Sequence, residues 1–347
     1  MTVKKPTIRD VARVSGVSPM TVSHVLNNRS EKVGAVTRER VMQVIDELHY
    51  SPSAIARGLS RRRLDSIGVV FYTQTPSRLV SASYHGDILG GILEAATSRG
   101  QSTTLFTEVG FTDNHTRVNV YCDGRCDGLI FVAPPAEPVL IRAMEHTQVP
   151  FVVIGEPLGE SHWSYIGLDN IAAAKTAVEH LIAHGHQRIA FLGGNDKLSS
   201  SLLRGCGYRE ALSGAGMKID PSLTLPGLYN AETGYQRAVT LMTRESNRPT
   251  AIFCCSDDIA FGALKALRDL NINVPDEVSV IGFDDRDGAA TSIPPLTTMR
   301  QPVIQIGYQA VELLLEQVIE GVPAGRSEMW PAELVVRDSV ATCAVDG

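Results

Sequence analysis

Polar side chains in the C-terminal three quarters of the chain occur where predicted strands end. Asp284, Ser256 and Arg204 each come soon after a run of apolar residues of strand length. Ligands of open α/β sheets bind beyond the carboxyl ends of the strands, so these positions could meet a small molecule. Carboxylate, hydroxyl and guanidinium groups hydrogen-bond to hydroxyls or ring edges, and the rings of Tyr84 and Tyr229 could cover an apolar face. The chemistry indicated is binding of a small polyhydroxylated ligand.

Catalytic motifs do not accompany these residues. No Gly-x-Gly-x-x-Gly follows the first predicted strand, there is no phosphate loop, and no Ser or Cys nucleophile has a readable base partner. Cys122 and Cys126 are the only close pair of the six cysteines worth weighing as a metal or redox site, and no second such pair or histidine cluster accompanies them. We therefore expect no enzyme activity, no metal and no cofactor. A sugar-modifying enzyme or a solute-binding protein without a DNA role is the alternative.

The elements that would position the polar residues alternate between strands and helices. Strands are predicted at 66–71, 102–107, 128–132, 151–154, 188–192, 251–255 and 278–283. Helices fill 86–99, 113–122, 138–147, 171–184, 200–214, 231–245 and 258–270. The near-continuous apolar strands are typical of parallel sheets covered on both faces, so the pattern predicts two doubly wound lobes. Asp257 is expected to cap the helix at 258–270. Asp169 and Asn170 are expected to cap the helix that begins at 171.

The N-terminal part has a different sequence pattern, which predicts two short helices joined by a glycine turn. The run from Thr7 to Asp10 has a capping-box pattern, Gly16 suits a tight turn, and Ser18 with Pro19 suits the start of a second helix. These features predict an all-α helix-turn-helix. A third helix is predicted at 37–48, with a start weakened by the sequence Gly-Ala-Val at 34–36.

The second helix has one apolar face, Val22, Val25 and Leu26, and a second face that could read DNA bases. The base-facing candidates are Pro19, Met20, Thr21 and His24, and the phosphate-contacting candidates are Arg9, Arg29 and Lys32. Further candidate DNA contacts in the head are Thr7, Ser18, Ser23, Asn27 and Tyr50.

Net charge is divided unevenly along the chain. Residues 1–65 carry 12 Lys and Arg against 6 Asp and Glu, which leaves 20 against 32 for the rest of the molecule. The basic end is therefore the expected nucleic-acid end. No apolar run approaches the roughly 20 residues that span a bilayer, and the start lacks the apolar core of a signal peptide. We expect a cytoplasmic protein without a membrane partner.

The segments TIRDVARVSGVSPMTVSHVLNN and LHYSPSAIARGL closely resemble the N-terminal signature of the lactose/galactose repressor (LacI/GalR) family, and the head is most similar to its purine-repressor branch. The resemblance implies a homodimeric transcriptional repressor that binds a pseudo-palindromic operator under the control of a small molecule. It also implies a hinge helix that folds over the DNA minor groove, with Ser53, Ala56 and Arg57 as contacts and Leu59 as a wedge between base pairs.

The same resemblance implies a type I periplasmic-binding-protein-like effector domain. The domains would be a head at 1–50, a hinge and basic linker at 51–65, and two lobes at 66–347. The first lobe would take 66–165 and 295–322, and the second 166–294 and 323–347. Arg204 and Asp284 match the family's most characteristic effector contacts, although a lobe-closing salt bridge is the alternative. The other pocket-lining positions would be Tyr84, His85, Ser200, Tyr229 and Ser256.

Leu198 is a departure from the purine-binding branch, which has a purine-contacting arginine there. A sugar or sugar derivative is therefore the expected effector, and a purine is the alternative.

Overall fold

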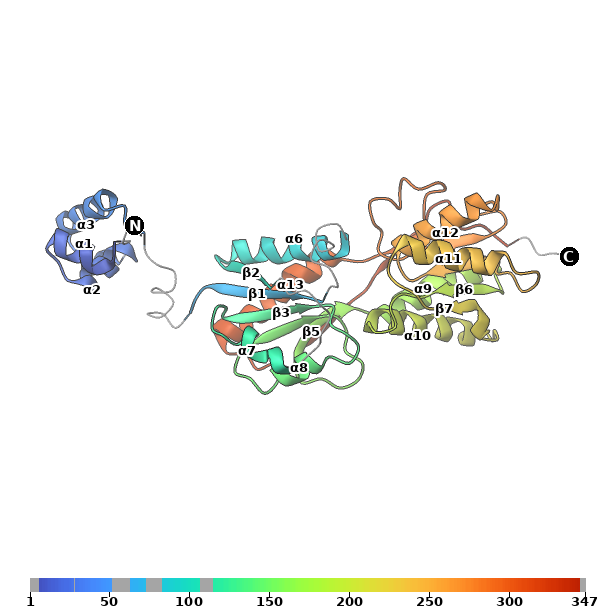
Figure 1. The fold of residues 1–347 in the computed structure, drawn as a ribbon, viewed down its shortest axis with the longest axis horizontal. Helices are drawn as coiled ribbons and strands as arrows, with labels where there is room; N and C mark the ends of the chain where they lie inside the picture. The colour runs from blue at the N-terminus through green and yellow to red at the C-terminus, as the bar shows by residue number, and fades with distance from the viewer. Residues whose placement is uncertain (1–5, 28, 52–62, 73–82, 107–114, 344–347) are drawn as a thin grey trace. The chain divides into compact units, whose positions relative to one another are not determined.

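The structure is a computed structural model that describes residues 6–27, 29–51, 63–72, 83–106 and 115–343. Contacts divide the chain into two units, Met1–Asp65 and Ser66–Gly347 (Figure 1). The predicted hinge contacts Ser53, Ala56, Arg57 and Leu59 lie outside the described residues.

The first unit is a three-helix head. Its helices are α1 (Ile8–Ser15), α2 (Pro19–Leu26) and α3 (Ala35–Glu47), with a short 3-10 turn at Ser30–Lys32. Thr7 and Asp10 form the predicted capping box, and Gly16 takes a left-handed φ of 66°, which a side-chain-bearing residue adopts at a cost. Ser18 caps α2, and its hydroxyl accepts from the backbone N–H of Thr21 at 3.1 Å. The predicted helix-turn-helix is thus present.

The head is held together by aliphatic side chains from all three helices. The fully or nearly fully buried set is Val11, Ala12, Val22, Val25, Val41, Val44 and Ile45. Helix α3 starts at Ala35, two residues earlier than predicted, and its N-cap residue Gly34 makes no side-chain capping bond. Packing of the buried stripe on α3 therefore compensates for a start that lacks a side-chain cap.

The second unit begins with a six-stranded parallel sheet in the order β11-β5-β4-β3-β1-β2. These strands are β1 (Ser66–Phe71), β2 (Ser102–Phe106), β3 (Gly128–Val132), β4 (Phe151–Ile154), β5 (Ser164–Leu168) and β11 (Ser327–Trp330). Helices α6 (Ser83–Ser98) and α13 (Val303–Leu315) share one buried core with the sheet. Helices α7 (Val118–Tyr121) and α8 (Val139–Met144) share the core on the opposite face. A 3-10 turn at His115–Arg117 precedes α7, and a π-helical turn at Glu316–Glu320 follows α13.

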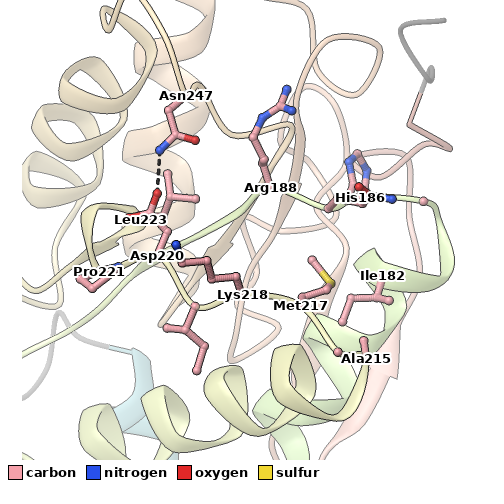
Figure 2. A pocket seen from close by; sticks show the side chains of 14 residues that line it. Ile182, His186, Arg188, Ala215, Met217, Lys218, Asp220, Pro221, Leu223 and Asn247 are labelled. Atoms are coloured by element: carbon pink, nitrogen blue, oxygen red, sulfur yellow. Dashed lines mark hydrogen bonds between the residues drawn. The ribbon is translucent and has the colours of Figure 1, made fainter.

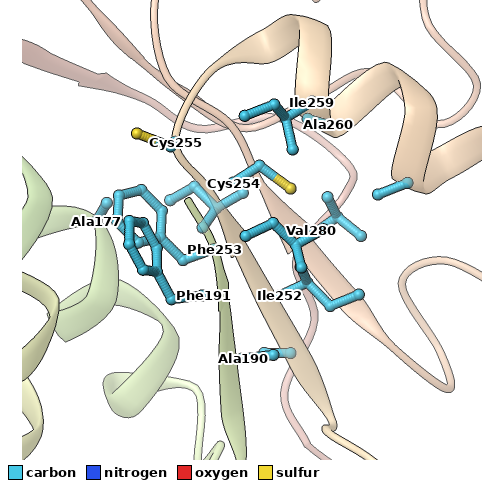
Figure 3. Close-up of a cluster of buried hydrophobic side chains, with 14 of the residues drawn as sticks. Ala177, Ala190, Phe191, Ile252, Phe253, Cys254, Cys255, Ile259, Ala260 and Val280 are labelled. Carbon is cyan, nitrogen blue, oxygen red and sulfur yellow. The ribbon is translucent and has the colours of Figure 1, made fainter. Parts of the chain in front are cut away.

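A second parallel sheet has four strands in the order β7-β6-β8-β9. The strands are β6 (Ile189–Leu192), β7 (Thr224–Leu225), β8 (Ala251–Cys254) and β9 (Ser279–Ile281), with a 3-10 turn at Pro221–Leu223. Its helices are α9 (Asn170–Ala183), α10 (Ser199–Gly214), α11 (Ala231–Met242) and α12 (Asp257–Asp269). The rings of Phe191 and Phe253 stack at 5.3 Å in the core of this lobe (Figure 3). The predicted pair of doubly wound lobes is therefore confirmed.

The expected lobe boundaries are wrong at three places. Leu296 and Met299 are buried in the core of the second lobe, although 295–322 was assigned to the first. Strand β5 runs to Leu168, past the expected boundary at 165, and β11 pairs with β5 in the first-lobe sheet although 323–347 was assigned to the second lobe. The sequence of β11, Ser-Glu-Met-Trp, is an edge strand that alternates between exposed and half-buried residues. An edge strand of this kind lacks the continuous apolar run by which the inner strands were recognised. Strands β10 (Thr298–Arg300) and β12 (Glu333–Val335) form a separate antiparallel pair.

No helix among the described residues is long and apolar enough to cross a membrane. The same residues hold no group of three or more His, Cys, Asp or Glu side chains that could bind a metal ion.

Candidate functional site: an effector cleft and a DNA-reading helix

A cavity of about 270 Å³ lies at the carboxyl ends of the strands and is lined from both lobes. Polar and aromatic residues at the starts of α6, α10, α11 and α12 reach it, because in each βα unit the helix begins beside the end of the preceding strand. All seven predicted effector residues line it, namely Tyr84, His85, Ser200, Arg204, Tyr229, Ser256 and Asp284. Leu198, at the start of α10, lines it as well.

Arg204 is the most extensively held cation of the cleft. Its side chain is 5% exposed, Nε donates to Oδ1 of Asn170 at 2.9 Å, and Nη1 donates to the carbonyl of Cys255 at 2.6 Å. The guanidinium carbon lies 3.6 Å from the centroid of the Phe283 ring, a cation–π arrangement. These contacts fix the orientation of the guanidinium before any ligand arrives.

Asp284 lies beside Arg204, with Oδ1 3.7 Å from Nη1. Oδ1 also accepts from Nε2 of Gln301, and the backbone of Asp284 has an unusual φ of 125°. Burial raises the pKa of Asp284 to about 7, although the charge of Arg204 acts in the opposite direction. Both residues of the pair belong to the second lobe, so this salt bridge does not join the two lobes, and that alternative is excluded in the structure described.

Tyr229 and Ser200 form the hydroxyl-bearing corner of the cleft. The Tyr229 hydroxyl is 3.0 Å from Ser200 Oγ and 3.4 Å from Cys255 Sγ. A Cβ atom on Gly194 would lie 2.4 Å from Cζ of Tyr229, so the absence of a side chain at Gly194 is what admits the ring. Burial raises the pKa of Tyr229 well above its usual range, which keeps the phenol neutral.

Tyr84 and His85 line the cleft from the first lobe, at the start of α6. Burial raises the pKa of Tyr84 to about 12 and lowers the pKa of His85 to about 4. Both side chains are therefore neutral at pH 7. Nδ1 of His85 is buried and has no hydrogen-bond partner among the described residues.

Ser256, not Asp257, caps α12. The Ser256 hydroxyl accepts from the backbone N–H of Ile259 at 3.3 Å, so the prediction that Asp257 caps this helix is wrong. Asp257 is fully buried and accepts instead from the Thr298 hydroxyl at 2.6 Å and from the backbone N–H of Arg286 at 2.8 Å. It thereby ties the start of α12 to β10, a contact between segments far apart in sequence.

Several lining residues of the cleft were not predicted as ligand contacts, and Glu156, Asn170 and Gln301 are three of them. Asp169 caps α9 as expected, whereas the buried side chain of Asn170 supports Arg204. Glu156 follows β4 and could have been found by the strand-end rule. Gln301 belongs to a crossover segment after β10, and no pattern in the sequence places it beside Asp284.

A second cavity, of about 760 Å³, lies beside the amino end of β6, away from the strand ends that form the cleft (Figure 2). Its acidic residue Asp220 is already bonded to Nδ2 of Asn247 at 2.7 Å and to the backbone N–H of Ser222 at 2.8 Å. None of the predicted effector residues lines it, so its size alone does not make it the effector site.

The DNA-reading candidates of the head lie on α2 and around it. Met20 is 66% exposed, and Ser18 and Pro19 are exposed as well, whereas Thr21 and His24 are half-buried. Ser23 is half-buried and its carbonyl accepts from Nδ2 of Asn27 at 2.8 Å. The remaining described candidates Thr7, Arg9, Arg29 and Lys32 are exposed, and Tyr50 packs against the head core as a partly buried residue.

Comparisons with known proteins agree with this architecture. Residues 7–53 match the model of bacterial regulatory proteins of the lacI family, and residues 178–340 match that of a periplasmic binding protein-like domain. The chain is 33% identical over 337 residues to the transcriptional repressor PurR of Pasteurella multocida, covering 96% of this chain and 98% of that protein. The chain belongs to the LacI family.

Solved LacI-family structures have the same fold. The lac repressor dimer bound to operator and the anti-inducer ONPF has a TM-score of 0.87, with 28% identity, 97% of this chain and 100% of that chain covered. A complex of the transcriptional regulator CelR with cellobiose has a TM-score of 0.73, with 31% identity, 96% of this chain and 99% of that chain covered. As a member of the LacI family, the present chain is a DNA-binding transcriptional regulator.

Proposed function

We propose that the protein is a cytoplasmic homodimeric repressor whose two heads bind a pseudo-palindromic operator and whose affinity for DNA is set by a small molecule in the cleft. The basic, three-helix head supports the DNA part, since a head of this size reads only a short half-site. Two-fold symmetry shared by protein and operator would double the length of the site. The DNA-reading residues are those predicted on and around α2, and the hinge contacts would complete them.

The effector that the cleft suits best is a sugar or sugar derivative. The observation that carries this is the fixed Arg204–Asp284 pair beside the hydroxyls of Ser200 and Tyr229, which offers donors and acceptors at one place. Aromatic rings of Tyr84 and Tyr229 add apolar surface. Leu198 stands where the purine-binding branch has an arginine, which favours a sugar over a purine, although a PurR protein is among the relatives. The proposal includes no catalytic role for these residues.

The test uses the full chain and has two parts. DNA selected by the protein from random sequence should be pseudo-palindromic and bound by a dimer, and a single asymmetric site bound by a monomer would overturn the DNA proposal. Calorimetric titration of sugars and purines into wild type, Arg204→Ala and Asp284→Asn then tests the cleft. An effector whose affinity neither substitution changes would place the effector site elsewhere.

A further inference from the structure

Glu156 contributes a carboxylate oxygen to the cleft that no described residue pairs with. Glu156 comes two residues after the end of β4, lines the 270 Å³ cavity and has a buried Oε2 without a hydrogen-bond partner. Buried polar atoms in folded proteins are almost always hydrogen-bonded. An orphan acceptor in the wall of a binding cleft is therefore a position where a ligand can supply the missing donor.

None of the described groups that shift the pKa of Glu156 is positively charged. Burial raises the pKa of Glu156 and the nearby carboxylate of Asp169 raises it further, whereas hydrogen bonds from the side chain and the backbone of Asn170 only partly offset these effects. The described groups that act on Glu156 are thus one acid and one amide. A donor from outside the protein would be the group that stabilises the ionised carboxylate.

The two arginines of the cleft are already engaged by protein groups. Arg204 is held by Asn170, by the Cys255 carbonyl and by Asp284. Arg286 pairs with Asp258. The described lining residues include three carboxylates and two arginines. Two of the carboxylates, Asp284 and Asp258, pair with the arginines, so Glu156 is left without a cationic partner among them.

The helix starts around the cleft are also largely capped from within. Asp169, Asn230 and Ser256 accept from the first-turn N–H groups of α9, α11 and α12. Helix starts that have their own acceptors offer less to an anionic ligand than open ones would. Of the helices named here, α10 begins at the cleft without a side-chain cap.

We propose that Glu156 is an effector contact from the first lobe and that the effector gives it a hydroxyl or ammonium donor, so that the cleft takes a neutral or amino sugar and rejects its phosphate ester. This rests on the proposal that the cleft binds a sugar effector. At about 270 Å³ the cavity lies at the small end of ligand pockets, which suits a monosaccharide in scale. A phosphate would meet Glu156 and Asp284 as like charges, which are strongly disfavoured in a partly dehydrated site.

The experiment titrates the full chain with matched probes. Glucose, galactose and mannose are each compared with the 2-amino and 6-phosphate derivative by calorimetry at pH 7.5. The variants are Glu156→Ala, which removes the acceptor, and Glu156→Gln, which keeps an acceptor but removes the charge. Glu145→Gln is the matched control, because Glu145 Oε1 is also buried without a partner but does not line the cleft.

At least one neutral or amino probe should bind wild type, and its phosphate counterpart should bind at least about tenfold more weakly. Glu156→Ala should weaken binding about 10- to 100-fold, and Glu145→Gln should leave it unchanged. Glu156→Gln separates the two donors. If the effector donates a hydroxyl, Glu156→Gln should weaken binding less than about threefold. If the effector donates an ammonium group, Glu156→Gln should weaken binding as much as Glu156→Ala does.

Two results would overturn the inference alone. They are a probe whose binding is lost in Arg204→Ala but unchanged in Glu156→Ala, and a phosphate ester that binds more tightly than its neutral and amino counterparts. Each of these leaves the sugar-binding cleft in place. If wild type bound none of the probes, this inference would fail, whereas the sugar effector would fail only if the wider titration of sugars under the proposed function also found no ligand.

Discussion

The ring of Tyr229 lies against the backbone of Gly194 so closely that a methyl group there would be 2.4 Å from Cζ of the ring. Real side chains do not approach to this distance, so any larger residue at 194 must displace the tyrosine. Displacement would break the 3.0 Å contact between the Tyr229 hydroxyl and Ser200. Gly194 therefore shapes one wall of the cleft.

Gly194→Ala is therefore expected to weaken effector binding by about tenfold while the chain remains folded, because one hydrogen-bonding corner of the cleft is lost. Calorimetry with the effector measures the affinity, and circular dichroism checks the fold. Gly214→Ala is the control, since a Cβ there meets nothing within 4 Å. Equal affinities of both variants and wild type would contradict the role given to Gly194.

Asp284 and Asp257 should each contribute a loss of stability to the larger unit that grows as the pH rises from about 4 toward the raised pKa values of these groups. Burial raises the pKa of Asp284 to about 7 and of Asp257 to about 6, so the folded state holds protons that the unfolded state has released in this range. Above these pKa values both carboxylates are charged and buried, and their destabilising contribution is complete. Urea unfolding at pH 5, 6, 7 and 8 measures how the free energy of unfolding changes with pH.

Asp284→Asn removes one of these carboxylates, so its free energy of unfolding should fall less, or rise more, with increasing pH than that of wild type. The variant Asp276→Asn, at an exposed position, should show the same pH dependence as wild type. A pH dependence that is the same in wild type and in Asp284→Asn would show that Asp284 titrates near its ordinary pKa and is ionised throughout this range.

Ser256→Ala should cost about 1 kcal/mol of unfolding free energy, because the Ser256 hydroxyl is the N-cap of α12. Thermal and urea unfolding of the full chain measure the loss. Ser213→Ala, at an exposed position in α10, should cost much less. A Ser256→Ala variant as stable as wild type would mean that its bond to the Ile259 N–H contributes nothing.

Two substitutions in the head should have different effects on DNA binding. Lys32→Ala removes an exposed cation, so it should weaken binding to all DNA sequences alike. The slope of the logarithm of the binding constant against the logarithm of the salt concentration should become less steep by about 0.9. Met20→Ala removes a 66% exposed side chain on α2 and should change which bases are preferred. Electrophoretic mobility shifts over a range of salt and of operator variants distinguish the two. A Lys32→Ala variant that changed base preference instead would overturn its assignment to phosphate.

Leu59→Ala should leave folding and effector binding nearly intact while removing most operator affinity and DNA bending. The predicted role of Leu59 is to unstack a base step from the minor groove, at a cost that the contacts made by the bent DNA offset. A circular-permutation gel measures the bend. Equal bending by wild type and variant would contradict the wedge.

Local chemistry was readable from the sequence alone. The capping box at Thr7, the turn at Gly16 and the cap at Ser18 depend on residues three or fewer positions apart, so the head could be predicted in detail. The inner strands β1, β3 and β4 were equally clear, because strands buried on both faces are apolar throughout. The strand-end rule then indicated Asp284, Ser256 and Arg204.

Only the tertiary structure decided which distant segments meet. Strand β11 is an edge strand with alternating exposure, and its pairing with β5 about 160 residues away depends on the path of the crossovers. Gln301 reaches Asp284, and Thr298 reaches Asp257, for the same reason. The orphan oxygen of Glu156 depends on every neighbour around it at once. Spacing along the chain predicts local bonds and periodic burial, whereas partners contributed by different segments are fixed only when the whole chain has packed.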